Sequence, residues 1–246
     1  MQYVGEAIHR AARDCDVDAL RGELLAGVSP DLINENCGRS AFHIVCGNDP
    51  SREQVACCNL LIEHGASVHV RDIRGDTVLH FASFLHNVPL VRKLIELGAD
   101  IDASGYGECR PLHVTCFEAS FRTALLLLSA GADVNARCEN GSTALEISLE
   151  EHNRALPGSY RMYPILLRAG ADLPAETDHP YIQKVIDAGG WANYERLHLD
   201  RLTAMLTPPP PPTGRRRSRR RLSPLRRLPP EVLRKIAAFA FHAGYY

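Results

Sequence analysis

A short sequence marker recurs along this chain at intervals of 33 to 39 residues. It is a glycine that follows a leucine-rich run and that precedes alanine in every copy but the first. The five copies are Gly27-Val28, Gly65-Ala66, Gly98-Ala99, Gly131-Ala132 and Gly170-Ala171, with successive glycines 38, 33, 33 and 39 residues apart. A period of this length predicts a solenoid, in which each copy is one small unit that buries its apolar face only against its neighbours.

A second marker keeps the same period. It is a histidine after an apolar residue, found as Ile8-His9, Phe42-His43, Leu79-His80 and Leu112-His113, with Leu145-Glu146 in register in the fifth copy. The two markers are 18 residues apart in the first, third and fourth copies, 22 apart in the second and 24 apart in the fifth. The apolar periodicity of the interval predicts two short helices in each copy, and the longer intervals predict insertions between or within the helices of copies two and five.

Glycines occupy two kinds of position in this pattern. Those of the first marker come just after a helical run, where the left-handed conformation that ends a helix favours glycine. A second set falls beside polar residues at predicted turn tips, where a tight hairpin needs the same backbone freedom. This second set is Gly38, Gly75, Gly107 and Gly141.

These residues resemble the ankyrin-repeat family over residues 1–175. The best copy contains Thr77-Val78-Leu79-His80 and then Leu97-Gly98-Ala99-Asp100. The fifth copy departs from the pattern, with Glu146 for the motif histidine and Ala144 for the motif proline, as expected at the end of a stack. The resemblance implies an all-α solenoid of about five repeats with β-hairpin-like turns. It also implies that the motif histidines hydrogen-bond to backbone between repeats.

Eleven histidines and eight cysteines raise the alternatives of a metal site or a catalytic site. The cysteines include no Cys-x-x-Cys pair, and the motif histidines are spread a repeat apart, whereas zinc ligation needs them to converge on one ion. The chain has no Gly-x-Ser-x-Gly, no phosphate-binding glycine loop with lysine and no His-Glu-x-x-His. We therefore expect no metal, no cofactor and no enzymatic activity.

The resemblance implies a concave binding surface made of hairpin tips and the exposed faces of the first helices. The positions that face outward in the ankyrin frame are Arg39, Ile73, Arg74, Asp76, Phe84, Leu85, Tyr106, Phe117, Glu118 and Asn140. The middle of this set is apolar and aromatic, which is typical of a protein-binding hot spot. In the alternative interpretation, Phe84 and Phe117 pack against adjacent turns and are largely buried. The main functional hypothesis is a scaffold that binds another protein on this surface.

Residues 176–206 are expected to form a degenerate repeat or helical cap. Apolar residues recur with helical spacing in 181–188 and in 193–206, on either side of Gly189-Gly190-Trp191. We expect one more helical hairpin that covers the end of the fifth copy, with Trp191 and Tyr194 packed at its turn.

The net charge of -1 hides two oppositely charged parts. Residues 1–214 carry 18 basic and 28 acidic side chains, whereas 215–246 carry 10 basic and one acidic. Residues 207–224 are rich in proline and arginine and are expected to form a disordered linker. Its basic cluster is Arg215, Arg216, Arg217, Arg219, Arg220 and Arg221. The cluster is typical of a nuclear import signal, a contact with an anionic surface or part of a proline-rich ligand, and nucleic-acid binding is the least favoured use because no aromatic residues lie between the arginines.

The first 25 residues are interrupted by charges, and the longest apolar stretch is the six residues from Ile236 to Phe241. Neither feature fits a signal peptide or a membrane span. We therefore expect a protein of the cytoplasm, the nucleus or both, without membrane contact.

Residues 225–246 are predicted to contain a short amphipathic helix with proline at its start. The segment resembles the beginning of an F-box, as in ankyrin proteins with a truncated F-box-like motif. That resemblance implies recruitment of the adaptor of a cullin-type ubiquitin ligase, which would make the chain a substrate-recognition subunit. The implied adaptor-binding residues are Leu228, Pro229, Val232, Leu233 and Ile236. In the alternative interpretation, this helix folds back on residues 181–206 as part of a cap.

Overall fold

The computed structural model describes residues 6–153 and 161–206. Two compact units divide the chain, Met1–Asp172 and Leu173–Tyr246. The predicted linker 207–224 with its arginine cluster, and the predicted helix 225–246 with its adaptor-binding residues, lie outside the described residues. Within the described ranges every regular element is a helix, and none of these helices is long and apolar enough to cross a membrane.

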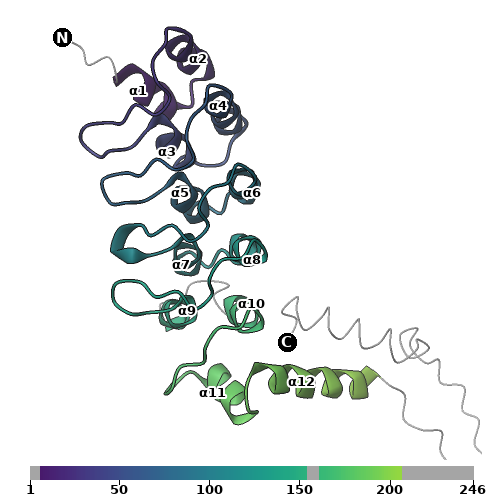
Figure 1. The fold of residues 1–246 in the computed structure, drawn as a ribbon. Coiled ribbons are helices and arrows are strands. Elements are labelled where there is room, and N and C mark those ends of the chain that lie inside the picture. Colours follow the sequence, from purple (N-terminus) through teal and green to yellow (C-terminus); the bar gives the residue numbers. More distant parts are fainter. Residues whose placement is uncertain (1–5, 154–160, 207–246) are drawn as a thin grey trace, which may run out of the picture. The chain divides into compact units, whose positions relative to one another are not determined.

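Helices of the first unit form five consecutive pairs, one for each sequence copy (Figure 1). The pairs are α1 (Glu6–Asp14) with α2 (Val17–Leu25), α3 (Ala41–Cys46) with α4 (Arg52–Glu63), α5 (Val78–Phe84) with α6 (Val88–Glu96), α7 (Pro111–Phe117) with α8 (Phe121–Ser129), and α9 (Ala144–Asn153) with α10 (Met162–Arg168). Within this unit, the first helices of successive pairs pack against one another in order, and the long loops between pairs project from their side. The predicted all-α solenoid of about five repeats is confirmed.

Leucines from both helices of the pairs make the core between them. Those no more than 2% exposed are Leu20, Leu60, Leu61, Leu79, Leu94, Leu112, Leu127, Leu145 and Leu166. Burial of one such side chain contributes about 1.5–3 kcal/mol. The helices of each pair also pack against those of the next pair, so part of this burial depends on a neighbouring copy, as in solenoids generally.

The insertion in copy two is divided between a loop and a helix. Residues 47–51 separate α3 from α4, whereas only residues 85–87 separate α5 from α6. In addition, α4 has 12 residues and α6 has nine. Part of the longer interval in copy five falls at 154–160, outside the described residues.

The long loops between pairs fold back as narrow hairpins. Isolated antiparallel bridges join Ile33 to Ser40, Arg71 to Thr77 and Arg137 to Thr143. The corresponding loop of copy four contains a 3-10 turn, η1 (Tyr106–Glu108), and is closed by the bond from Gly105 N–H to the Cys109 carbonyl, at 2.8 Å. The predicted turn-tip glycines Gly38, Gly75, Gly107 and Gly141 all have positive φ, as these turns require.

His43, His80 and His113 each join the start of their own helix to the hairpin of the next repeat, and His9 also contacts the next repeat. In His80, Nδ1 accepts the Thr77 N–H at 3.1 Å, so the ring proton is on Nε2, which donates to the Cys109 carbonyl at 3.1 Å. The same two bonds recur at His43, from the Ser40 N–H and to the Asp76 carbonyl. The Nε2 contacts of the other two motif histidines run from His9 to the Leu32 carbonyl at 2.8 Å and from His113 to the Ala136 carbonyl at 3.0 Å. The bond between repeats that the family resemblance implies is therefore present at all four junctions.

Glu146 replaces the histidine in the fifth copy, after which the described residues contain no further hairpin of this kind. Its Oε2 accepts the Thr143 N–H at 2.7 Å and the Thr143 hydroxyl at 2.9 Å, which caps the start of α9 as the histidines cap theirs. A carboxylate has no proton to donate to a next-repeat carbonyl. The departure from the motif therefore keeps the local cap and gives up the bond between repeats.

The second unit contains α11 (Pro180–Asp187) and α12 (Trp191–Leu206). They form the predicted helical hairpin, whose turn contains Gly189 and Gly190, both with positive φ. The rings of Trp191 and Tyr194 lie 6.0 Å apart between centroids, as expected for packing at this turn. The role of this hairpin as a cap for the fifth repeat stays a prediction.

The buried histidines predict that stability falls in mild acid. Burial lowers the pKa of His43, His80 and His113, because the charged ring loses its hydration. As the pH falls through about 6.5, the unfolded chain binds protons that the folded chain does not, so the free energy of unfolding decreases by up to about 1.4 kcal/mol per pH unit for each histidine. Chemical denaturation between pH 7.5 and 5.5 measures this slope.

A pair of variants assigns the slope to the buried rings. His80→Gln should make the dependence on pH shallower, whereas His64→Gln, a change at an exposed histidine, should leave it as it is. Equal slopes in all three proteins would contradict the assignment.

Candidate binding groove

A groove of about 740 Å³ runs between the hairpin tips of copies two and three and the first helices. The hairpin side is lined by Asn34, Asn36, Cys37, Arg39, Arg74 and Asp76. The helix side is lined by Arg13 of α1, by His43, Ile44, Gly47 and Asn48 of α3 and its end, by His80, Phe81 and Phe84 of α5, and by Val114 of α7. The groove thus spans parts of the first four helix pairs.

Backbone bonds between hairpin tips hold the hairpin side of the groove in place. Ile73 N–H donates to the Cys37 carbonyl at 3.3 Å, and Tyr106 N–H donates to Asp76 Oδ1 at 2.9 Å. Gly38 lies so close to the next hairpin that a Cβ there would be 2.7 Å from Ile73 Cγ2 and 2.8 Å from Ile73 N. Adjacent tips are therefore in direct contact, and a glycine is required at this position.

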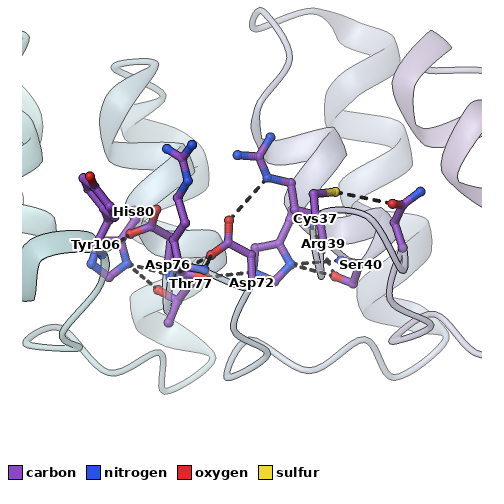
Figure 2. Close-up of polar contacts among 11 residues, drawn as sticks. Cys37, Arg39, Ser40, Asp72, Asp76, Thr77, His80 and Tyr106 are labelled. Atoms are coloured by element: carbon purple, nitrogen blue, oxygen red, sulfur yellow. Dashed lines mark hydrogen bonds and ion pairs between the residues drawn. The ribbon is translucent and has the colours of Figure 1, made fainter.

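The carboxylate of Asp72 organises these tips (Figure 2). Its side chain is 1% exposed, and its Oδ1 accepts the N–H groups of Arg74 at 2.8 Å and of Asp76 at 3.0 Å. Its Oδ2 pairs with Arg39 Nε at 3.4 Å. Burial of a carboxylate is costly unless hydrogen bonds and an opposite charge replace its lost hydration. The Arg39 guanidinium therefore has a structural role between hairpins two and three.

Aromatic rings lie under two of the groove arginines. The guanidinium carbon of Arg39 lies 4.6 Å from the centroid of the Phe81 ring, and that of Arg74 lies 5.2 Å from the centroid of the Tyr106 ring. The Phe81 ring also meets the His43 ring edge-on, with centroids 5.6 Å apart. These contacts restrict both guanidinium groups to defined positions on the groove wall.

Charges in the groove are unevenly paired. Arg39 is matched by Asp72, but among the described residues no carboxylate lies within 4.0 Å of the guanidinium of Arg13 or Arg74. Both of these arginines are exposed. The groove therefore presents cationic groups that a ligand can approach without displacing a protein partner.

Four of the ten residues predicted to bind a partner line this groove: Arg39, Arg74, Asp76 and Phe84. Tyr106, 65% exposed, is joined to the groove through Arg74, and Ile73, 68% exposed, is the neighbour of Arg74 in the same hairpin. The remaining four lie outside the lining: Leu85, Phe117, Glu118 and Asn140. Phe84 is 50% exposed and Phe117 is 37% exposed, so Phe84 is the more open of these two equivalent positions.

Sequence reasoning missed Arg13 and Phe81, although the motif marks both positions. Residues one position after the motif histidine line the groove at Ile44, Phe81 and Val114. Residues four positions after it line the groove at Arg13, Gly47 and Phe84. These two positions share one face of a helix, so the histidine marker could have served to find them.

The histidines of the groove and two nearby cysteines are held in hydrogen-bonded or buried positions. His43 and His80 use both ring nitrogens in the bonds described above. Burial raises the pKa of the Cys109 and Cys116 thiols to about 12, which keeps them in the protonated, unreactive form. Within residues 6–153 and 161–206, no three His, Cys, Asp or Glu side chains gather in a way that could hold a metal ion.

Comparisons with known proteins identify related sequences. Residues 8–105 match the family model described as ankyrin repeats in three copies. The B-cell lymphoma 3 protein homolog of Mus musculus is 31% identical over 177 residues, which make up 70% of this chain and 37% of that protein. The ankyrin repeat and SOCS box protein 16 of Homo sapiens is 34% identical over 143 residues, 56% of this chain and 30% of that protein. For the ankyrin repeat and SOCS box protein 11 of Danio rerio, the identity is 32% over 112 residues, 44% of this chain and 38% of that protein.

The chain spans about a third of the length of each of these relatives. The similarity therefore covers only part of each of these larger proteins.

Two of the groove arginines, Arg39 and Arg74, are predicted to differ in their contribution to stability. Arg39→Ala should lower the free energy of unfolding by about 1–3 kcal/mol, because it leaves the buried Asp72 carboxylate with one partner fewer. Arg74→Ala, a change of the same residue type in the same groove, should stay within about 0.5 kcal/mol of the unaltered protein. Urea denaturation compares the two, and equal losses would contradict a structural role specific to Arg39.

Proposed function

This chain contains ankyrin repeats, and we propose that it binds another protein in the concave groove and catalyses no reaction there. Ankyrin repeats act in protein interaction and are in general not enzymatic. The observation that carries the proposal is the set of aromatic side chains left open to solvent beside unpaired arginines. Phe84 is 50% exposed and Tyr106 is 65% exposed. Exposed aromatic and arginine side chains at one site are typical of protein-binding hot spots.

Absence of catalysis is supported by how the reactive residue types are used. The imidazoles of His43 and His80 have their nitrogens committed to backbone groups, so neither ring offers a free nitrogen as a general base. The raised pKa of the Cys109 thiol, about 12, argues against use of that cysteine as a nucleophile.

Removal of the exposed aromatic side chains tests the proposed binding surface. Phe84→Ser combined with Tyr106→Ser should abolish capture of partner proteins from cell extract, with little change in Tm because neither ring is buried. Quantitative mass spectrometry of captured proteins gives the first readout and thermal unfolding gives the second. A large fall in Tm would instead assign the two rings to the core.

Leu125→Ser is the matched control. Leu125 is 56% exposed and belongs to α8, a second helix of its pair, away from the groove lining. The control should retain every partner that the doubly altered protein loses. Loss of the same partners from the control would mean that general surface apolarity, and not the groove, explains capture.

A second candidate function is recruitment of a cullin-type ubiquitin ligase through residues 225–246. Two of the relatives pair ankyrin repeats with a second named module, the SOCS box. In this chain, the segment that follows the repeats resembles the beginning of an F-box, with Leu228 and Ile236 in the positions that would bind the adaptor. The repeats would then hold the substrate while this segment contacts the ligase.

Adaptor binding is tested with substitutions that leave the repeats unchanged. The full chain should co-purify with the cullin adaptor, and Leu228→Ala with Ile236→Ala should remove the adaptor while partners bound to the repeats remain. If the segment is a cap instead, deletion of 226–246 should lower Tm, and no adaptor should be captured by the full chain. Comparison with a chain lacking 207–246 separates partners of the repeats from partners of the tail.

A further inference from the structure

We infer that the groove recognises an acidic segment of its partner protein, in which carboxylates flank an aromatic or large apolar side chain. This inference rests on the proposed function and adds the chemistry of the ligand. It depends on three features of the described residues. These are the contacts that hold the groove arginines, the hydrogen-bond donors that these arginines leave free, and the apolar side chains that line the same groove.

The arginines are held by contacts that leave hydrogen-bond donors open. Arg39 uses Nε for Asp72 and lies over the Phe81 ring, and neither contact occupies its two terminal amino groups. Arg74 lies over the Tyr106 ring and makes no side-chain ion pair among the described residues. A guanidinium held over a ring keeps its N–H donors, which match the two oxygens of a carboxylate.

Charge in the groove favours an anionic ligand. Three guanidinium groups line it, from Arg13, Arg39 and Arg74, against the Asp76 carboxylate. The Asp72 carboxylate behind the wall offsets Arg39, and Asp76 offsets one further charge, so these residues have a net charge of +1. Arg13 and Arg74 supply it, because neither has a carboxylate within 4.0 Å among the described residues. These two lie on the first helix of copy one and on the hairpin of copy three, and so belong to opposite sides of the groove. Carboxylates on either side of a central residue could each meet an arginine.

Apolar surface in the same groove favours an anchor residue. Ile44, Phe81 and Val114 line the helix side, with Phe84 half open beside them. A purely polar ligand would leave this surface in contact with water, whereas an aromatic or large aliphatic side chain would cover it. The ligand is thus expected to combine both kinds of side chain.

The charges of the rest of the chain argue against two other occupants. Residues 215–246 carry 10 basic side chains and one acidic, so the groove arginines would repel the chain's own tail. Residues 1–214 have ten more acidic than basic side chains, which disfavours a nucleic acid with a phosphate at every step. A peptide with a few carboxylates meets the groove charge at short range, while the surrounding acidic charge is screened beyond about 8 Å at physiological salt.

A random peptide library displayed on phage tests this with the full chain as bait. Selected peptides should be enriched in Asp and Glu next to aromatic or large aliphatic residues. Synthetic copies of these peptides should bind to Arg74→Glu and to Arg13→Glu with an affinity lower by about tenfold or more, as measured by fluorescence anisotropy. The matched control is Arg92→Glu, at an exposed arginine of α6 outside the groove, and it should bind as the unaltered protein does. Selection on the chain with both groove changes should shift enrichment towards Lys and Arg.

Each other outcome has a defined meaning. Enrichment of neutral or basic peptides whose binding is lost in Phe84→Ser but kept in Arg74→Glu would overturn the acidic ligand and leave the proposed binding surface standing. No enrichment, or peptides whose affinity is the same for every groove variant, would overturn both the acidic ligand and the proposed binding surface. Binding of oligothymidylate that depends on Arg13 and Arg74, without acidic peptide enrichment, would assign the groove to nucleic acid. Equal peptide affinity after removal of 207–246 is expected, and a gain would identify the tail as an occupant.

Discussion

The hydrogen bond from the motif histidine to the next hairpin is the contact on which the rest of the repeat stack depends. In His80, Nδ1 accepts a backbone N–H at the start of the histidine's own helix. The ring proton is therefore on Nε2, which donates it in a hydrogen bond to the neighbouring repeat. One side chain thus caps a helix and sets the position of a loop about 30 residues away. Because the hairpins are held in this way, their tips meet, and a groove with defined walls exists between tips and helices.

The groove arginines illustrate how similar residues acquire different roles in such a structure. Arg39 lies beside a buried carboxylate and over a ring, so its charge is mostly used to stabilise the contact between two hairpins. Arg74, in the next hairpin, has a ring but no carboxylate partner among the described residues. A surface built from repeats can therefore keep its shape with one arginine and offer charge to a ligand with another.

Much of the fold could be predicted from the positions of glycine and histidine, because each of these residues meets a local requirement of the repeat. The periodic glycines follow the second helix of each pair and all have positive φ, a conformation that favours glycine, so their spacing marks the ends of those helices. The first helices were less predictable, because α1, α5 and α7 are followed by the non-glycine residues Cys15, His86 and Ala119 in the same conformation. The groove was only partly predictable. Phe84 and Phe117 occupy equivalent positions, yet only Phe84 lines the groove, and Leu85, the residue that follows α5, does not line it. Equivalence along the chain does not specify where the neighbouring hairpins place their tips.

By itself, the sequence determined the repeat period, the helix pairs and the junction histidines, because each depends on contacts within one copy or between adjacent copies at a constant spacing. The replacement of histidine by Glu146 likewise marks the end of the series within the sequence itself. Only the tertiary structure decided that Asp72 is buried, that it pairs with Arg39, and that Arg13 shares a groove with Arg74. These are relations between side chains of different copies, and they follow from how the hairpins stack in space, which no single copy encodes.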